Sequence, residues 1–474
     1  MNKRNHLNRA VATLMSLSLC VAMVSALALQ GLSGGASAFQ GQDIMGGAAI
    51  VFKRPQRVRD LIGGASLLVV KRSPRSPTRP EVARNNPPDR RRPRPPKPGE
   101  TPTTGEPQLT DADQGEAFKN QGNTYYDLGD FPKAIEAYLN ALKHTPKDSV
   151  IYNNLGAAYF GSGKQNEAAE AFKKSLALKP NDADAFFNLG IAYTSIEKYD
   201  DAINAFKEAV RVKPDWGEAY NALGDSYLSL NRYAEAAKAY EQAVRIQPDN
   251  AAAFSNAGFA YDKLALLPQS IEALQKTVKL KPDDAVAYNN LGASLYKAGR
   301  YPEAISAFTN SINLKPDDAE ALNNLGAAYY ITEQYPRALE TFLKAASAKL
   351  GFADALYNLG NAYYMSGKYP QAATAYREAI RLKPDYAEAR TNLGSLLIAL
   401  NQYAAAVTEL QQAIQLKPDN PVSHNNLGYA YAQLAASSDK AAASDYYQKA
   451  IAAYKEAIRL KPDYAKALNN LGSV

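Results

Sequence analysis

The feature that most constrains this chain is a glycine that recurs at a constant interval. Ten glycines keep this interval and an eleventh follows after a longer one: Gly122, Gly156, Gly190, Gly224, Gly258, Gly292, Gly326, Gly360, Gly394, Gly428 and Gly472. A period of about 34 residues indicates stacked supersecondary repeats, because one repeat alone is too small to bury its apolar face. We therefore predict a repeat array over residues 115–474, with ten repeats and a partial eleventh. The ten extra residues in the tenth repeat, near 437–440, are predicted to form a longer loop between two helices.

Each repeat is predicted to contain two helices. In the second repeat, Leu155, Gly156 and Tyr159 follow the 3/4 spacing of one helical face. The Gly-Ser-Gly segment at 161–163 ends that helix, and Phe172 belongs to the apolar face of the next one. We expect the small glycine to let the two helices approach closely, with Phe172 filling the space beside it.

This pattern resembles the tetratricopeptide repeat family. Its order of aromatic, Leu-Gly, Tyr, Ala, aromatic, Ala and Pro is complete in the third repeat: Phe186, Leu189, Gly190, Tyr193, Ala202, Phe206, Ala209 and Pro214. The resemblance implies an all-α fold, a right-handed α-solenoid of about ten helix-turn-helix repeats known as a TPR superhelix. It also implies that the first helices of the repeats line a concave groove.

An asparagine precedes the Leu-Gly pair, or its equivalent, in almost every repeat. The column comprises Asn120, Asn154, Asn188, Asn256, Asn290, Asn324, Asn358, Asn392, Asn426 and Asn470, and only the fourth repeat departs, with Ala222. A helical wheel turns this position about 100° from the packed leucine, toward the concave side. A side-chain amide both donates and accepts, so it can pair with a peptide backbone of any sequence.

This column resembles the asparagine ladder in the repeat half of O-linked N-acetylglucosamine transferases. The resemblance implies that the ten asparagines bind an extended peptide. The alternative interpretation is that they stabilise adjacent repeats through local hydrogen bonds and contact no ligand.

Six residues after the asparagine, several repeats carry an aromatic residue: Tyr126, Phe160, Tyr296, Tyr330 and Tyr364. We expect these side chains to border the same groove. Tyrosine suits adaptable contacts, because it combines an apolar ring with a hydrogen-bonding tip.

Cysteine and histidine are too sparse for most site chemistry. The only cysteine is Cys20, and the three histidines, His6, His144 and His424, do not stand at metal-ligand spacing. No catalytic residue, metal site or cofactor is therefore predicted, and the chain is interpreted as a non-enzymatic protein.

The basic charge of the chain is confined to its N-terminal part. Residues 1–110 contain 17 Lys+Arg and 6 Asp+Glu, a net of +11, which leaves 37 and 41, a net of −4, for residues 111–474. The overall +7 thus says little about what the array binds. We expect no nucleic-acid partner.

Residues 1–38 have the organisation of a secretory signal. Basic residues at 3, 4 and 9 precede the apolar stretch 10–32, and Ala36-Ser37-Ala38 provides small residues for cleavage after Ala38. The signal peptide is therefore assigned to residues 1–38, with an uncleaved signal anchor as the alternative. Either form predicts an exported protein that is periplasmic, held in the cell envelope or secreted.

Residues 39–70 contain a short duplication. The segment 44–52 (IMGGAAIVF) is echoed by 61–69 (LIGGASLLV), and a Lys-Arg pair closely follows each copy. The copies are too short to span a bilayer. They are interpreted as two strand-like segments, or alternatively as a docking element beside a membrane.

Residues 71–110 form a Pro/Arg-rich segment with 11 prolines. Proline removes backbone donors and favours extended conformations, so this segment is predicted to be a disordered, semi-rigid linker. The alternative is that residues 53–98 contact a membrane surface or an anionic polymer through their positive charge.

Together these features predict an exported protein–protein interaction scaffold that binds an extended peptide or a partner protein in the concave groove. One alternative is a membrane- or surface-tethered structural adaptor in cell-envelope assembly. The other is a polysaccharide-associated module.

Overall fold

A computed structural model describes residues 110–474, and their secondary structure consists of 21 helices. The prediction of an all-α repeat array is confirmed for this part of the chain. The predicted signal peptide, the duplicated segment and all of the predicted linker except Thr110 lie outside the described residues. Thr110 caps the first helix, because its hydroxyl accepts a hydrogen bond from the Asp113 N–H at 3.2 Å.

The described residues divide into two compact parts, here called the N-terminal stack (110–282) and the C-terminal stack (283–474). The helices of the N-terminal stack are α3 (Asp111–Asp127), α4 (Phe131–His144), α5 (Ser149–Gly161), α6 (Gln165–Leu178), α7 (Ala183–Ser195), α8 (Tyr199–Val212), α9 (Gly217–Ser229), α10 (Tyr233–Ile246), α11 (Ala251–Lys263) and α12 (Leu267–Leu280).

The C-terminal stack comprises α13 (Ala285–Lys297), α14 (Tyr301–Leu314), α15 (Ala319–Ile331), α16 (Tyr335–Ala348), α17 (Ala353–Met365), α18 (Tyr369–Leu382), α19 (Ala387–Ala399), α20 (Tyr403–Leu416), α21 (Pro421–Ala436), α22 (Lys440–Leu460) and α23 (Ala465–Gly472). None of the helices within 110–474 combines the length and the apolar character needed to cross a membrane.

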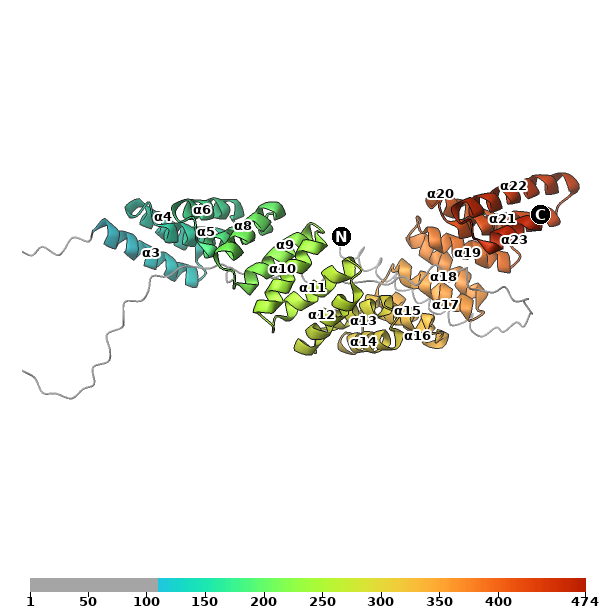
Figure 1. The fold of residues 1–474 in the computed structure, drawn as a ribbon, viewed down its shortest axis with the longest axis horizontal. Helices are drawn as coiled ribbons and strands as arrows, with labels where there is room; N and C mark the ends of the chain where they lie inside the picture. The colour runs from blue at the N-terminus through green and yellow to red at the C-terminus, as the bar shows by residue number, and fades with distance from the viewer. Residues whose placement is uncertain (1–109) are drawn as a thin grey trace, which may run out of the picture. The chain divides into compact units, whose positions relative to one another are not determined.

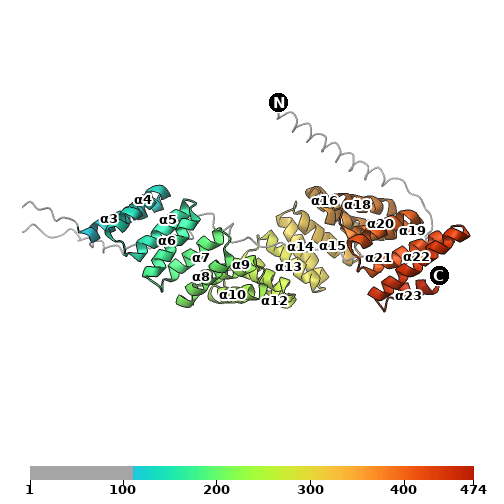
Figure 2. The same cartoon turned by 90° about the horizontal axis from the view of Figure 1, so that it is seen from above.

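Every repeat pairs an odd-numbered first helix with the even-numbered second helix that follows it (Figures 1 and 2). Within a stack, each second helix also packs against the next first helix, and successive first helices touch. The result is a linear succession of helix pairs in each stack, as expected for a solenoid in which a repeat contacts only its neighbours.

The recurrent glycine is where the two helices of a repeat meet. A Cβ atom added to Gly156 would lie 2.6 Å from the ring of Phe172, and one added to Gly326 would lie 2.7 Å from the ring of Phe342. Both rings are fully buried. The predicted packing role of the glycine is therefore confirmed, since no larger residue leaves room for the ring.

The connection between the two helices is short and places one residue in the left-handed region. In the C-terminal stack these residues are Gly299, Glu333, Gly367 and Asn401, with φ of 74°, 59°, 70° and 59°. They stand one repeat apart and are the middle residues of three-residue connections. The tight turn thus fixes where the second helix starts.

The loop prediction for the tenth repeat is wrong. The connection at 437–439 is still three residues long, while α21 has 16 residues instead of 13 and α22 has 21 instead of 14. The ten extra residues therefore lengthen the helices by three and seven. The run Ala441-Ala442-Ala443 favours helix, and the Asp439 carboxylate caps it by accepting from two backbone N–H groups at 3.0 and 3.1 Å. Tyr431 and Tyr446 stack across the lengthened pair, with ring centroids 6.0 Å apart.

We expect Gly326→Ala to lower the free energy of unfolding of the C-terminal stack by about 1–3 kcal/mol, because the added methyl overpacks the Phe342 ring. Urea unfolding followed by helical circular dichroism measures the loss. Gly472→Ala is the matched control, because Gly472 holds the same repeat position and a Cβ there meets no atom within 4 Å. Equal unfolding midpoints for the two variants would contradict the packing role.

Candidate functional site

The asparagine column is mostly buried. Seven of its members are at most 4% exposed: Asn154, Asn188, Asn256, Asn290, Asn324, Asn358 and Asn392. Asn426 and Asn470 are half-buried, and Asn120, in the first repeat, is exposed. Most of these amides therefore do not face a groove that a ligand can enter.

Ladder amides of one kind donate to an asparagine 35 residues earlier, in the first helix of the preceding repeat. The pairs are Asn188 with Asn153, Asn324 with Asn289 and Asn358 with Asn323, at 3.0, 3.0 and 2.9 Å from Nδ2 to Oδ1. Asn470 reaches Asn425 in the same way at 3.0 Å across the ten-residue insertion. These bonds join consecutive first helices within a stack.

Amides of a second kind donate to an oxygen 31 residues earlier, one helical turn further along the preceding first helix. The pairs are Asn154 with Asn123, Asn256 with Asp225 and Asn392 with Asn361, at 3.0, 2.8 and 2.9 Å. The same three oxygens accept from the hydroxyls of Tyr138, Tyr240 and Tyr376, at 2.7, 2.6 and 2.7 Å. Asn426 donates to the hydroxyl of Ser395 at the equivalent position, at 2.8 Å. One buried acceptor thus serves both the second helix of its own repeat and the next repeat.

The single exception in the column has a physical reason. Ala222 follows a repeat whose two acceptor positions hold Phe187 and Ile191, both buried and apolar. An asparagine at 222 would bury an amide without a partner, which costs free energy. Phe187 instead packs its ring against Trp216, with centroids 4.6 Å apart. Donor and acceptor are therefore lost together at this junction.

This arrangement favours the alternative interpretation of the ladder, in which the asparagines hold repeat to repeat. Direct contact between the ten asparagines and a peptide stays a prediction, and the burial of most of their amides argues against it.

The predicted groove aromatics lie at the end of the first helix, against the start of the second. The pairs Tyr126–Phe131, Tyr296–Tyr301, Tyr330–Tyr335 and Tyr364–Tyr369 have ring centroids 5.6, 5.3, 5.7 and 5.4 Å apart. Phe160 is followed by Gln165 at the partner position and is itself buried. The structure therefore groups four of the five predicted aromatics into tyrosine or tyrosine–phenylalanine pairs, and Phe160 belongs to the core.

Three of these pairs follow one another in the C-terminal stack. We call this set the tyrosine strip: Tyr296, Tyr330 and Tyr364 with Tyr301, Tyr335 and Tyr369, together with Ile331 and Met365, which follow two of the first-helix tyrosines. Tyr364 is 7% exposed, as little as Phe160, whereas the other five tyrosines are half-buried. The first helices that carry it, α13, α15 and α17, contact one another in order. Ile331 and Met365 are 44% and 37% exposed, which gives the strip an accessible apolar component that the sequence interpretation missed.

The hydroxyls of the strip are not used within the described residues, where none of the six tyrosines has a hydrogen bond from its hydroxyl. Burial raises the pKa of Tyr296 and of Tyr364 to about 12. Burial, followed by the nearby Tyr335, Tyr357 and Tyr296, also raises the pKa of Tyr330. The hydroxyls consequently stay protonated at neutral pH and keep their capacity to donate.

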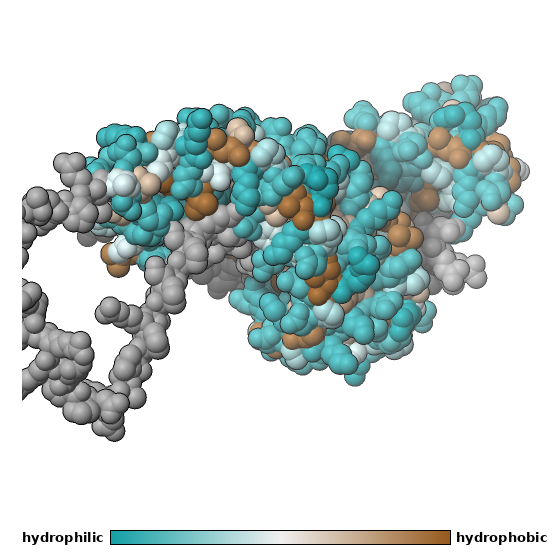
Figure 3. Space-filling model, turned by 60° about the vertical axis from the view of Figure 1, so that its left-hand side comes forward, coloured by the Kyte–Doolittle hydropathy of each residue, from teal (hydrophilic) through white to brown (hydrophobic). Residues whose placement is uncertain are grey.

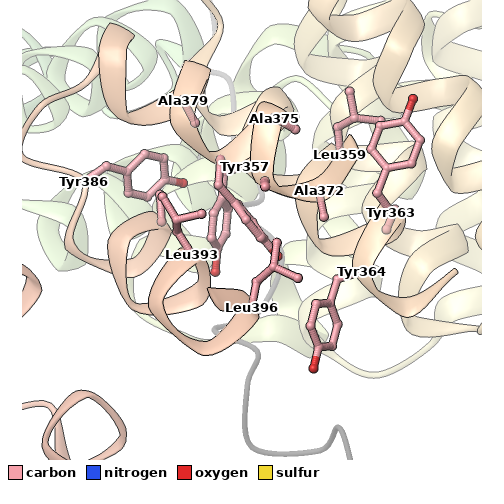
Figure 4. Packing of buried hydrophobic residues seen from close by; sticks show 14 of the residues in the cluster. Tyr357, Leu359, Tyr363, Tyr364, Ala372, Ala375, Ala379, Tyr386, Leu393 and Leu396 are labelled. Atoms are coloured by element: carbon pink, nitrogen blue, oxygen red, sulfur yellow. The ribbon is translucent and has the colours of Figure 1, made fainter. Parts of the chain in front are cut away.

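Close to the strip, the core is tightly packed. Figure 4 shows the ring of Tyr386 directed toward Tyr357 and Leu393, whereas the ring of Tyr364 leads away from them. The Tyr357 and Tyr386 ring centroids are 5.0 Å apart. On the face shown in Figure 3, hydrophilic residues cover most of the described surface and hydrophobic residues form small separate patches. The two exposed apolar side chains of the strip, Ile331 and Met365, are therefore a feature to explain.

Comparison with known families fits this architecture. A model described as tetratricopeptide repeat matches residues 294–354, 357–421 and 391–453, and one described as TPR repeat matches 445–474. The chain belongs to the tetratricopeptide repeat (TPR) family. A further model, the C-terminal domain of cilia and flagella-associated protein 70, matches residues 97–321. The likeness to O-linked N-acetylglucosamine transferases is not among these matches.

Solved TPR structures resemble parts of the chain. The crystal structure of MamA is 30% identical over 34% of this chain and 94% of its own, with a TM-score of 0.33. YrrB, described as a TPR protein with an unusual peptide-binding site, is 24% identical over 42% and 97%, with a TM-score of 0.35. Yeast Tom70 is 16% identical over 76% and 87%, with a TM-score of 0.39. Scores below 0.5 carry no argument about function. No curated protein matches the sequence.

For the TPR ladder we expect Asn324→Ala to destabilise the C-terminal stack by about 1–3 kcal/mol, because Asn289 Oδ1 would lose its buried donor. Chemical unfolding measures the change. Asn120→Ala is the control: it has the same ladder position, is exposed, and has no preceding repeat among the described residues, so its loss should be near zero. A peptide-binding ladder without a structural role would leave both variants equally stable.

The exceptional junction offers a second test. Ala222→Asn and Ile191→Asn should each destabilise the N-terminal stack, since each buries an unpaired amide. The double variant should lose less than the sum of the two, because positions 191 and 222 have the spacing of the second bond type. A double-mutant cycle measures the coupling. Strict additivity would mean that the spacing does not determine the bond.

Proposed function

We propose that this TPR protein is an exported scaffold that binds an extended peptide segment of a partner protein along the tyrosine strip. TPR arrays in general serve as protein–protein interaction scaffolds, which makes a protein partner the starting point. The observation that carries the proposal is the set of three consecutive tyrosine pairs whose hydroxyls have no hydrogen bond within the described residues. Within the described residues, the asparagine ladder offers no comparable set of polar groups without hydrogen bonds.

The geometry of the strip suits an extended chain. Neighbouring helices pack about 8–10 Å apart, so three adjacent first helices offer tyrosine pairs over roughly 20 Å. An extended peptide advances about 3.3 Å per residue, so about six residues would cross the three pairs. Apolar side chains of such a peptide would contact the rings, Ile331 and Met365, while its carbonyls would accept from tyrosine hydroxyls.

The strip should therefore recognise the apolar side chains of the partner's peptide segment more than its charged ones. Ile331 and Met365 are the most exposed apolar side chains of the strip. Methionine and tyrosine side chains adapt to different neighbours. This favours a site that binds peptides of varied sequence over one that is specific for a single sequence. A carbohydrate that stacks on tyrosine rings is the competing ligand, and the binding test below separates the two.

We expect Ile331→Asp to weaken peptide binding about tenfold or more, because it places a charge on the apolar part of the strip. Peptides are first selected from a displayed library on the mature chain, and affinity is then measured by fluorescence anisotropy. Leu343→Asp is the control: Leu343 lies on the second helix of the same repeat, and is 37% exposed. If both variants bind the selected peptides like the parent, or if only oligosaccharides are retained, the peptide proposal is wrong.

Export is proposed from the N-terminal sequence. Cleavage after Ala38 predicts that the mature chain begins at Phe39. Fractionation of a tagged protein, with and without residues 1–38, should place the full chain outside the cytoplasm and the deleted chain inside. N-terminal sequencing that finds residues 1–38 retained on an exported chain would instead support the signal anchor.

A further inference from the structure

We propose that the chain carries its own ligand for the tyrosine strip, namely the duplicated apolar segments 44–52 and 61–69, bound intramolecularly. The inference concerns the surface used in the proposed function, but it does not require that a foreign peptide binds there. It gives a common explanation for two unexplained features, an apolar strip on a hydrophilic surface and an apolar duplication in a basic, proline-rich region.

The chemistry of the two partners matches. Residues 44–52 (IMGGAAIVF) contain no charged or hydrogen-bonding side chain, and residues 61–69 (LIGGASLLV) contain one serine. Burial of such segments removes apolar surface from water, which is the main driving force for association. Glycine pairs within each copy let the backbone come close to aromatic rings, because glycine has no Cβ. The tyrosine hydroxyls would then find the backbone carbonyls as acceptors.

The lengths also match. A nine-residue segment extends to about 30 Å at most, and the three tyrosine pairs extend over roughly 20 Å. One copy of the duplication is therefore long enough to cross α13, α15 and α17. Two copies, which begin at Ile44 and Leu61, would give the strip two alternative ligands of nearly the same composition, which raises its occupancy without a second site.

The tether favours the strip of the same chain. Forty residues, 70–109, separate the second copy from Thr110, and at about 3.1 Å per residue an extended segment of this length reaches roughly 120 Å. Its prolines and like charges favour extension over collapse. A covalent linker that spans the distance to the strip gives an effective local concentration that a free second copy at micromolar concentration does not reach, and the crosslinking experiment below distinguishes the two cases.

One charged group helps to orient the segment. Glu333 is exposed in the turn between α15 and α16, and its charge contributes to the raised pKa of Tyr335, after the larger effect of burial. It forms no ion pair with another described residue. The Lys-Arg pairs that follow the two copies, at 53–54 and 71–72, are complementary to this carboxylate.

Photo-crosslinking in the mature chain 39–474 tests the proposal. A benzophenone side chain at position 331 should crosslink to residues 44–69 of the same molecule, as shown by mass spectrometry of monomeric product at low protein concentration. The same probe at position 343 on α16 is the matched control and should give no such product. Absence of the product at 331, equal yields at 331 and 343, or crosslinks only between two chains would overturn the proposal.

A second variant separates this inference from the proposed function. Val51→Asp with Leu68→Asp places a charge in each copy and should abolish the crosslink from 331, while the helical content stays unchanged because both sites lie outside the array. If foreign peptides bind the strip, the same variant should bind them about tenfold more tightly, as for a site nine-tenths occupied by its own segment. A crosslink that is lost without any foreign peptide binding supports the internal ligand and rejects the proposed function. A crosslink that persists in the variant overturns the internal ligand.

Discussion

The close contact between one glycine and one large side chain of the second helix is the constraint on which the rest of the structure depends. That side chain is an aromatic ring in most repeats and a leucine, Leu274 or Leu410, in two of them. At Gly156 and Gly326 the second-helix ring lies where a Cβ would stand, so the two helices meet backbone to ring. This contact sets the distance between the helices of a pair and fully buries a large side chain. Because the repeats share this close approach, each presents its remaining faces to its neighbours in the same register.

In several repeats the polar chemistry beside this contact follows the type of ring; the repeat with Tyr454 is an exception, because Asn470 donates to Asn425 there. Where the ring is Tyr376, its hydroxyl needs a buried acceptor, and Asn361 supplies one that also receives the next repeat's amide. Where the ring is Phe342, the facing position is Ala327, and Asn323 accepts the amide instead. The requirement that buried polar groups be paired thus links one side chain in the core to the joint between repeats. The array therefore contains two arrangements in which the buried amide of the next repeat finds an acceptor.

The sequence predicts the period, the helix pairs and the role of the glycine, because these follow from spacing within one repeat. It does not reveal how deeply the asparagine ladder is buried, since a helical wheel locates Asn324 relative to its own Leu325 but does not say which neighbouring helix covers it. The signal was nevertheless present: Ala222 follows the repeat with Phe187 and Ile191, so donor and acceptor vanish together. The loop prediction for the tenth repeat is wrong for a different reason: it assigns the inserted residues to a loop, although their alanines favour helix.

The ladder also determines where recognition can occur. Amides that hold repeats together are dehydrated and already paired, and opening them to a ligand would weaken the joints that give the array its shape. Tyr330, at the end of α15, packs through its ring against Tyr335, and its hydroxyl forms no hydrogen bond with another described residue. Under the proposed function, stability and binding would therefore depend on different atoms of the same helices. This separation lets the strip change its residues, as at Ile331 and Met365, without a loss of the joints between repeats.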